Sequence, residues 1–254
     1  MKTVYGPVPS WRFGKSLGVD PICSMKKICS FDCVYCQLGK TKNKTMEREE
    51  YVEYAQVCKE LKRVDKSTSE VITFSGTGEP TLNQKLGDMI EFAQTFGFPV
   101  VVLTNSSLLH LKEVRRELSR ADIVSAKLDA PDERLFQKIN KPIEGIDFET
   151  VLDGLRDFRK EFGGKFALQM MFIRDNQETA GKMAELAREL KPDEVQIDTP
   201  LRHSPVPHLS EDEIDQIEDL FKGLPFISVY KKRKPQVVPL DIHETAARRP
   251  GEKF

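Results

Sequence analysis

Short apolar runs rich in Val, Ile and Phe alternate along the chain with longer segments whose apolar residues recur every three or four positions. The short runs predict strands at 18–22, 71–74, 100–104, 123–128, 166–173 and 195–198. The longer segments predict helices at 48–62, 84–96, 111–118, 148–162 and 178–190. Strands that alternate with helices in this way are typical of right-handed βαβ units. We therefore expect an α/β protein with a parallel sheet.

One more helix and one short apolar run follow these elements. Ser210 and Glu213 form a capping box that predicts a helix to about residue 221. The run 226–230 comes next, and a basic tail follows it. We divide the chain into an N-terminal segment (1–15), a main domain (16–221) and a short C-terminal extension (222–254).

The composition is that of an ordinary globular protein, with 31% charged and 39% hydrophobic residues among 254. No apolar stretch approaches the roughly 18 residues that span a bilayer. The chain start has no apolar segment of the secretory type, so we expect a cytoplasmic protein without a membrane partner. Five Cys, an odd number, do not suggest a disulfide framework and favour a metal or redox role.

Positive charge gathers at the two ends, although the net charge is −1. Residues 1–44 carry eight Lys or Arg against two Asp, and the last 24 residues carry seven against three Asp or Glu. Such asymmetry marks a basic face for an anionic partner such as RNA. The alternative is a solubilising tail together with a basic loop around an anionic cluster.

The most specific chemical signal is CSFDCVYC, which puts Cys29, Cys33 and Cys36 on one short loop. A loop with this spacing can present three thiolates to an iron–sulfur cube, and such clusters normally take four Cys. An iron left open is typical of a working metal centre, as in catalytic zinc sites. A zinc site completed by Cys23 is the alternative.

A second signal, SGTGEPT, directly follows the predicted strand 71–74. Gly76 and Gly78 allow a ligand to approach the backbone closely at the carboxyl end of a parallel strand. Backbone carbonyls and the Glu79 carboxylate at this place suit an ammonium group. An ordinary tight turn is the alternative.

The Cys loop, with Tyr35 before its last Cys, and the Gly-Glu-Pro turn after the next strand together resemble the radical S-adenosylmethionine superfamily. The resemblance implies a partial (βα)6 TIM-like barrel with the Cys loop after the first strand. It also implies a [4Fe–4S] cluster whose fourth iron binds the amino and carboxylate groups of S-adenosylmethionine. The reduced cluster would cleave this cofactor to a 5′-deoxyadenosyl radical, which abstracts hydrogen from a substrate.

Residue roles follow from the same resemblance. Cys29, Cys33 and Cys36 are expected to bind the cluster and so to form the catalytic centre. The expected cofactor-binding residues are Tyr35 near the adenine, Ser75, Gly76, Gly78 and Glu79 at the ammonium group, and Asn105, Lys127, Asp129 and Gln169. Asn105 as part of a helix cap is the alternative for that residue.

Lys127 and Asp129 lie two positions apart on a strand and so face the same side. We expect Lys127 to neutralise the methionyl carboxylate, and Asp129 to receive a ribose hydroxyl or to orient Lys127. A plain ion pair is the alternative, because charges in such strands are costly unless paired. Arg202, after the last strand, and Arg12 are candidates for contact with an anionic substrate.

A narrower resemblance, carried by segments such as CSFDCVYCQLG and VQIDTPLRHSP, is to small proteins of the branch that contains wyosine-type tRNA-modifying enzymes. It predicts radical modification of a tRNA base. Modification of a peptide, protein or small metabolite is the alternative, and a non-catalytic iron–sulfur protein is a third. Wyosine synthases carry a second cluster, whereas only Cys23 and Cys58 remain here. An external one-electron reductant, a flavodoxin or ferredoxin, is therefore implied.

Overall fold

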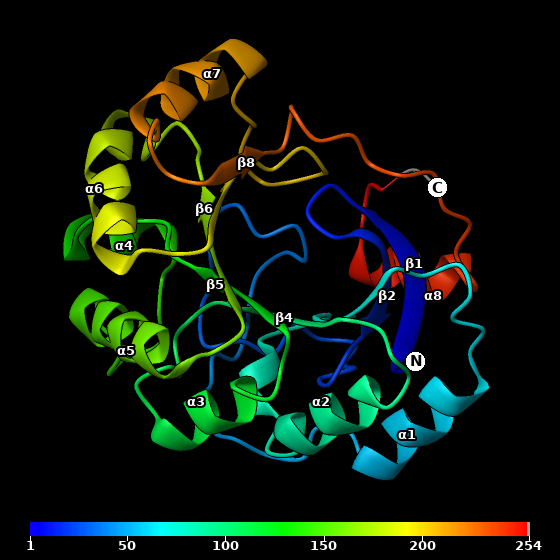
Figure 1. The fold of residues 1–254 in the computed structure, drawn as a ribbon. Coiled ribbons are helices and arrows are strands. Elements are labelled where there is room, and N and C mark those ends of the chain that lie inside the picture. Colours follow the sequence, from blue (N-terminus) through cyan, green and yellow to red (C-terminus); the bar gives the residue numbers. More distant parts are fainter. Residues whose placement is uncertain (253–254) are drawn as a thin grey trace.

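The chain folds into a curled sheet with helices along its outer side (Figure 1). The computed structural model describes residues 1–252. The strands are β1 (Val4–Ser10), β2 (Gly14–Val19), β3 (Val71–Phe74), β4 (Val100–Thr104), β5 (Ile123–Lys127), β6 (Lys165–Met171), β7 (Glu194–Asp198) and β8 (Phe226–Ser228). The helices are α1 (Tyr54–Arg63), α2 (Leu86–Gln94), α3 (Lys112–Leu118), α4 (Glu133–Ile139), α5 (Phe148–Glu161), α6 (Ala180–Leu190), α7 (Glu211–Leu220) and α8 (Ile242–Arg248), with 3₁₀ turns at Pro80–Leu82 and Gln177–Thr179.

The strands lie in the sheet in the order in which they occur along the chain. β1 and β2 are antiparallel, and every later strand is parallel to the one before it. Helical crossovers between such strands curl the sheet into part of a barrel. The predicted α/β partial barrel is confirmed. The prediction of six strands was too low, because β8 adds a seventh parallel strand and β1 adds an antiparallel edge.

The core follows from the apolar pattern. All four residues of β3 are buried, as expected for a parallel strand covered on both faces. On α5, Val151, Leu155 and Phe158 form one buried stripe against the sheet. The Phe158 ring stacks on that of Phe162 with centroids 4.7 Å apart. Packing of this kind holds the strand ends at fixed positions around the barrel interior.

The helix predicted at 48–62 begins only at Tyr54. The residues before it pair with the segment after β3 instead of forming a helix. Glu49 and Asn83 form a parallel bridge, and Arg48 Nε donates a hydrogen bond to the Thr81 carbonyl at 2.8 Å. This stretch therefore supports the turn that carries Glu79.

Two helices, α4 and α8, were not predicted. Each follows a capping Asp, since Asp132 accepts a hydrogen bond from Leu135 N and Asp241 accepts one from Glu244 N. Both helices span seven residues, which is too short for a clear apolar period. Within residues 1–252, no helix is long and apolar enough to cross a membrane.

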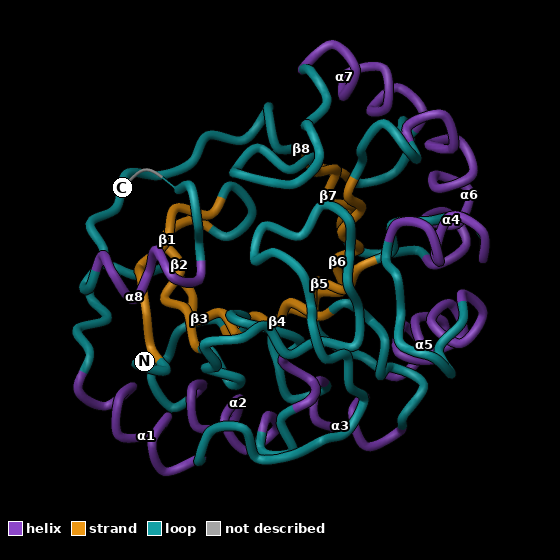
Figure 2. Tube along the Cα trace, turned by 180° about the vertical axis from the view of Figure 1, so that it is seen from behind, coloured by secondary structure: helices purple, strands orange, loops and turns teal. Residues whose placement is uncertain are grey.

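The last part of the chain runs from one edge of the sheet to the other (Figure 2). After β8 the chain passes to α8, which lies beside β1. Leu240 N donates to the Gly6 carbonyl at 2.7 Å, and Gly6 N donates to Thr245 Oγ1 at 3.1 Å. The extension thus joins the two edge strands of the partial barrel.

Glu60 of α1 fixes the start of β1. Its Oε2 accepts hydrogen bonds from Thr3 N at 2.7 Å, Thr3 Oγ1 at 2.9 Å and Val4 N at 3.1 Å. Partial burial acts to raise the pKa of Glu60, but hydrogen bonds from Gln56, Val4 and Thr3 outweigh it and lower this pKa. A lowered carboxyl pKa adds stability above the unfolded-state pKa, and this stability is lost as the pH falls through the folded-state pKa.

We therefore expect Glu60→Gln to reduce the free energy of unfolding by about 1 kcal/mol at pH 7. The deficit should shrink below about pH 4, where Glu60 also becomes neutral. Urea unfolding at pH 7 and below about pH 4 measures this deficit, with Glu53→Gln, at an exposed position, as the control. An equal deficit at both pH values would show that the charge of Glu60 is not the cause.

Candidate active site

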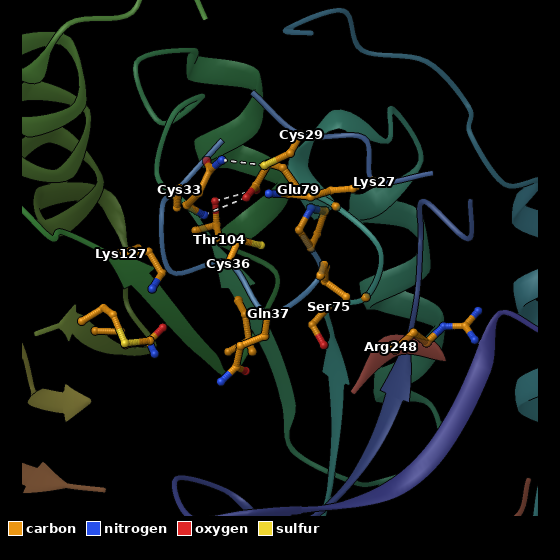
Figure 3. A pocket seen from close by; sticks show the side chains of 18 of the residues that line it. Lys27, Cys29, Cys33, Cys36, Gln37, Ser75, Glu79, Thr104, Lys127 and Arg248 are labelled. Atoms are coloured by element: carbon orange, nitrogen blue, oxygen red, sulfur yellow. Dashed lines mark hydrogen bonds between the residues drawn. The ribbon is translucent and has the colours of Figure 1, made fainter. Parts of the chain in front are cut away.

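The carboxyl ends of the strands and the Cys loop enclose a cavity of about 260 Å³ (Figure 3). Every site residue predicted from the sequence lines it except Asp129. These lining residues are Cys29, Cys33, Tyr35, Cys36, Ser75, Gly76, Gly78, Glu79, Asn105, Lys127 and Gln169. Segments up to 140 positions apart in the sequence, Cys29 to Gln169, thus meet at one place.

The three cysteines of the motif lie in the long connection between β2 and α1. Cys29 is buried, Cys33 and Cys36 are half-buried, and all are free thiols. Two side-chain amides point at the sulfurs: Asn105 Nδ2 lies 3.4 Å from Cys29 Sγ, and Asn140 Nδ2 lies 3.5 Å from Cys33 Sγ. Such donors stabilise negative charge on sulfur.

Burial raises the pKa of Cys29 to about 12 and that of Cys33 to about 11. Thiolates at these positions therefore require strong positive partners, which metal ions supply. Lys27 places a positive side chain near the three cysteines. Burial acts to lower the pKa of Lys27, but Cys36, Cys29 and Cys33 outweigh it and raise this pKa. Sequence reasoning missed Lys27, whose signal was its place in the basic N-terminal stretch.

In residues 1–252, no three His, Cys, Asp or Glu side chains are grouped around a point suited to one metal ion. An iron–sulfur cube makes a different demand on its ligands. Each thiolate binds its own iron, so the sulfurs need to surround a larger group.

The SGTGEPT turn requires glycine at positions 76 and 78, because a larger side chain would clash with neighbouring residues. Gly76 has a φ of +146°, and a Cβ on it would lie 2.2 Å from the Asp20 carboxyl carbon. A Cβ on Gly78 would lie 1.8 Å from the Ile28 carbonyl oxygen. The turn therefore packs directly on the chain that leads into the Cys loop. Ser75 adds a hydrogen bond between its Oγ and the Tyr5 hydroxyl, at 2.9 Å.

The Glu79 carboxylate is buried and heavily hydrogen-bonded. Its Oε1 accepts from Thr81 N, Thr81 Oγ1 and Thr104 Oγ1, whereas Oε2 accepts only from Asn105 N, at 2.7 Å. Burial raises the pKa of Glu79, and these hydrogen bonds oppose the shift. Oε2 retains capacity for a further donor. Asn105 does not cap a helix, because α3 has Leu111 at its cap position.

Asp129 lies behind the lining and joins the Cys loop to the sheet. It accepts hydrogen bonds from the Tyr35 hydroxyl, from Asn140 Nδ2 at 2.9 Å and from Met171 N at 2.9 Å. Lys127 Nζ is 3.8 Å from Asp129 Oδ1 and 4.9 Å from the centre of the Tyr35 ring. Lys127 and Tyr35 are therefore held together by a buried carboxylate.

On the neighbouring strand, Gln169 pairs in register with Lys127. Gln169 Nε2 donates to Asp198 Oδ2 at 2.7 Å, and Asp198 also lines the cavity. Arg12 and Arg202, the candidates for anion contact, line it too. Cys23 is not among the lining residues, and its Sγ receives a hydrogen bond from Arg248 at 3.3 Å.

The sequence patterns missed the contribution of the C-terminal extension. Arg248 and Arg249 line the cavity although they follow Cys36 by more than 200 positions. No local motif marks them, because their place depends on how α8 packs against β1. Gln37, which Figure 3 shows beside Cys36, was also missed.

Comparisons of the whole chain with known proteins identify its family. A family model described as the radical SAM superfamily matches residues 24–187. A UPF0026 protein of Synechocystis is 44% identical over 207 residues, which cover 80% of this chain and 77% of that protein.

Solved structures show the same fold. Streptococcus suis SuiB bound to S-adenosylmethionine matches with a TM-score of 0.64 and 13% identity, over 85% of this chain and 50% of that one. The structure of TYW1 with a lysine-pyruvate adduct bound matches with a TM-score of 0.63 and 19% identity, over 84% and 76%. The chain therefore belongs to the radical SAM superfamily and its UPF0026 group, and it is an enzyme that uses a [4Fe–4S] cluster and S-adenosylmethionine.

Proposed function

We propose that Cys29, Cys33 and Cys36 hold the [4Fe–4S] cluster and that the enzyme uses S-adenosylmethionine there to modify an anionic substrate by radical chemistry. The observation that carries the proposal is the meeting of three free thiols and the Glu79 turn in one cavity. An electron carrier needs no such cofactor-binding turn.

The residues around the thiols fit an anionic cluster. Asn105 and Asn140 aim amide donors at two of the sulfurs, and Lys27 adds positive charge beside all three. These groups would stabilise thiolate charge that burial disfavours. The cluster and S-adenosylmethionine, when bound, supply a 5′-deoxyadenosyl radical.

The remaining lining residues fit the polar groups of S-adenosylmethionine. Glu79 Oε2 and the backbone of Gly76 and Gly78 would receive the methionyl ammonium, and the Lys127 ammonium would neutralise the carboxylate. Tyr35 and Gln169 would contact the nucleoside part. Asp129 acts as a positioning residue, because it orients Lys127 and Tyr35 without lining the cavity.

Two classes of anionic substrate have support from different observations. Lys26, Lys40 and Lys42 are exposed on the Cys loop, which favours a tRNA whose base would enter the cavity. The fold shared with TYW1 is consistent with this. A small metabolite is favoured by the extension, because Lys231, Lys234, Arg248 and Arg249 pair with carboxylates. Lys232 and Arg233 are then the exposed cations without an ion pair among residues 231–252. Lys253 lies outside the described residues.

The proposed reaction needs one electron for each cleavage of the cofactor. With Cys23 and Cys58 as the other cysteines, the motif for a second cluster is missing from the sequence. We propose a flavodoxin or ferredoxin as the electron donor and the cytoplasm as the place of action.

We expect Cys33→Ala to abolish cleavage of S-adenosylmethionine and to remove most of the bound iron, because one iron loses its protein ligand. Iron analysis and the release of 5′-deoxyadenosine measure this after anaerobic reconstitution. Cys58→Ala, in α1 and away from the cavity, should retain both. Full cleavage by Cys33→Ala would contradict the assignment of the ligands.

Asp129→Ala should lower the free energy of unfolding by about 3 kcal/mol, because it leaves buried donors of Tyr35, Asn140 and Met171 unpaired. It should also weaken binding of S-adenosylmethionine, since Lys127 loses the carboxylate that holds its ammonium group in place. Urea unfolding and equilibrium dialysis measure the two effects. Asp153→Ala, at an exposed ion pair on α5, serves as the matched control. Unchanged cofactor binding by Asp129→Ala would remove its positioning role.

A tRNA substrate predicts binding of bulk tRNA that weakens steeply with salt. Replacing Lys26, Lys40 and Lys42 by Gln should then reduce the slope of log K against log salt by about three. The same change at Lys59, Lys112 and Lys182, which are exposed elsewhere, should not. Equal slopes for the two triple variants would count against tRNA and leave the small-molecule class.

A further inference from the structure

A group of cations lies where the extension meets the rim of the cavity. Arg12 comes from the β1–β2 turn, Arg202 from the loop after β7, Arg249 from the end of α8, and Lys234 from the extension. The three arginines line the main cavity and also a smaller one that adjoins it, which Lys234 lines as well. Four segments that are distant in the sequence therefore bring positive charge to one place; we call these four residues the rim cluster.

Two arginines of the rim cluster have buried donors without a protein partner. Arg12 Nε and Arg202 Nη1 are both inaccessible and make no hydrogen bond within residues 1–252. Burial lowers the pKa of Arg12, and burial followed by repulsion from Arg249 lowers that of Arg202 to about 10. Buried donors of this kind are rare in native proteins and call for an acceptor. A bound anion would supply it.

The carboxylates beside the rim cluster do not balance its charge. Asp198 is already engaged by Gln169 and by Thr199 N. Glu252 is shared by three cations, with its oxygens 2.6 Å from Arg249, 3.0 Å from Lys234 and 3.6 Å from Arg202. Glu194 also acts on Arg12 but is paired with Lys165 at 2.8 Å. Apart from that neutral pair, four cations face two carboxylates. The excess of two positive charges matches a dianion.

We propose that the rim cluster binds the phosphate group of a substrate that is a phosphate monoester, so that the rest of this small molecule lies in the main cavity. The inference rests on the proposed function, since it takes that cavity to be the site of reaction. Arginine forks suit phosphate oxygens, and a monoester carries close to two negative charges at neutral pH. A carboxylate or a phosphodiester of RNA carries only one. The buried position of the unpaired donors also fits a terminal phosphate better than a nucleic-acid backbone.

Glu252 gives the proposal a distinctive test, because its carboxylate pairs with the same cations that a phosphate would bind and so competes with it. Glu252→Gln should therefore strengthen the binding of inorganic phosphate by about threefold or more. Arg202→Gln should weaken it by about tenfold, since a charged hydrogen-bond donor is lost. Arg12→Gln should act in the same direction. Arg174→Gln, on an exposed pair with Glu213, should leave phosphate binding unchanged.

The experiment is isothermal titration of the reconstituted holoprotein with inorganic phosphate, with acetate and bulk tRNA as the other arms at equal ionic strength. Phosphate binding that exceeds acetate binding and responds to the variants as stated supports the proposal. Equal binding of acetate, no gain in Glu252→Gln, or displacement of phosphate by tRNA in proportion to its backbone charge would overturn it.

Release of 5′-deoxyadenosine is measured on the same wild-type preparation. Cleavage of S-adenosylmethionine without phosphate binding would overturn the phosphate site and leave the proposed function standing. Phosphate binding without cleavage would overturn the proposed function instead, and the rim cluster would remain an anion site.

Discussion

The ion pair between Asp20 and Arg248 holds together the parts of the chain that form the cavity. Both side chains are fully buried, with Arg248 Nε 2.9 Å from Asp20 Oδ2. Asp20 also accepts hydrogen bonds from Cys23 N at 2.8 Å and from Thr77 Oγ1 at 3.0 Å. One carboxylate thus joins the end of β2, the start of the Cys loop, the turn after β3 and α8. Removing one partner of such a pair typically costs about 3–5 kcal/mol.

This pair also explains why the glycine turn needs Gly76. The Asp20 side chain fills the space that a Cβ at Gly76 would take, so the turn and the ion pair depend on each other. On the other side of the turn, the buried Glu79 carboxylate accepts hydrogen bonds from Thr104 Oγ1 and Asn105 N at the end of β4. The geometry of this cavity is therefore set by buried carboxylates as much as by the apolar core.

Local sequence patterns predicted β3 to β7 well, because each is a short apolar run between helices with a clear period, whereas β2 lies at Gly14–Val19 and not at the predicted 18–22. The site residues that the motifs indicated, apart from Asp129, do line the cavity, since the carboxyl ends of neighbouring parallel strands meet by topology. The predictions failed where tertiary contacts decide the structure. Residues 48–53 pair with the chain after Glu79, and α8 is positioned by Arg248 and Asp20 across the whole sequence. The sequence places Asp129 near the cavity, but only the packed structure reveals that its carboxylate accepts hydrogen bonds from Tyr35 and Asn140.

The rim cluster lies outside the part of the chain that identifies the family. The radical SAM match covers residues 24–187, whereas Arg12, Arg202, Lys234 and Arg249 all lie before or after it. With the proposed roles, radical generation would be encoded in the matched stretch and substrate choice in its two flanks. Substitutions in these flanks would then change the substrate while the family match stays the same. Membership of the family therefore identifies the chemistry of this chain, and its two flanks are the place to look for differences in substrate among related proteins.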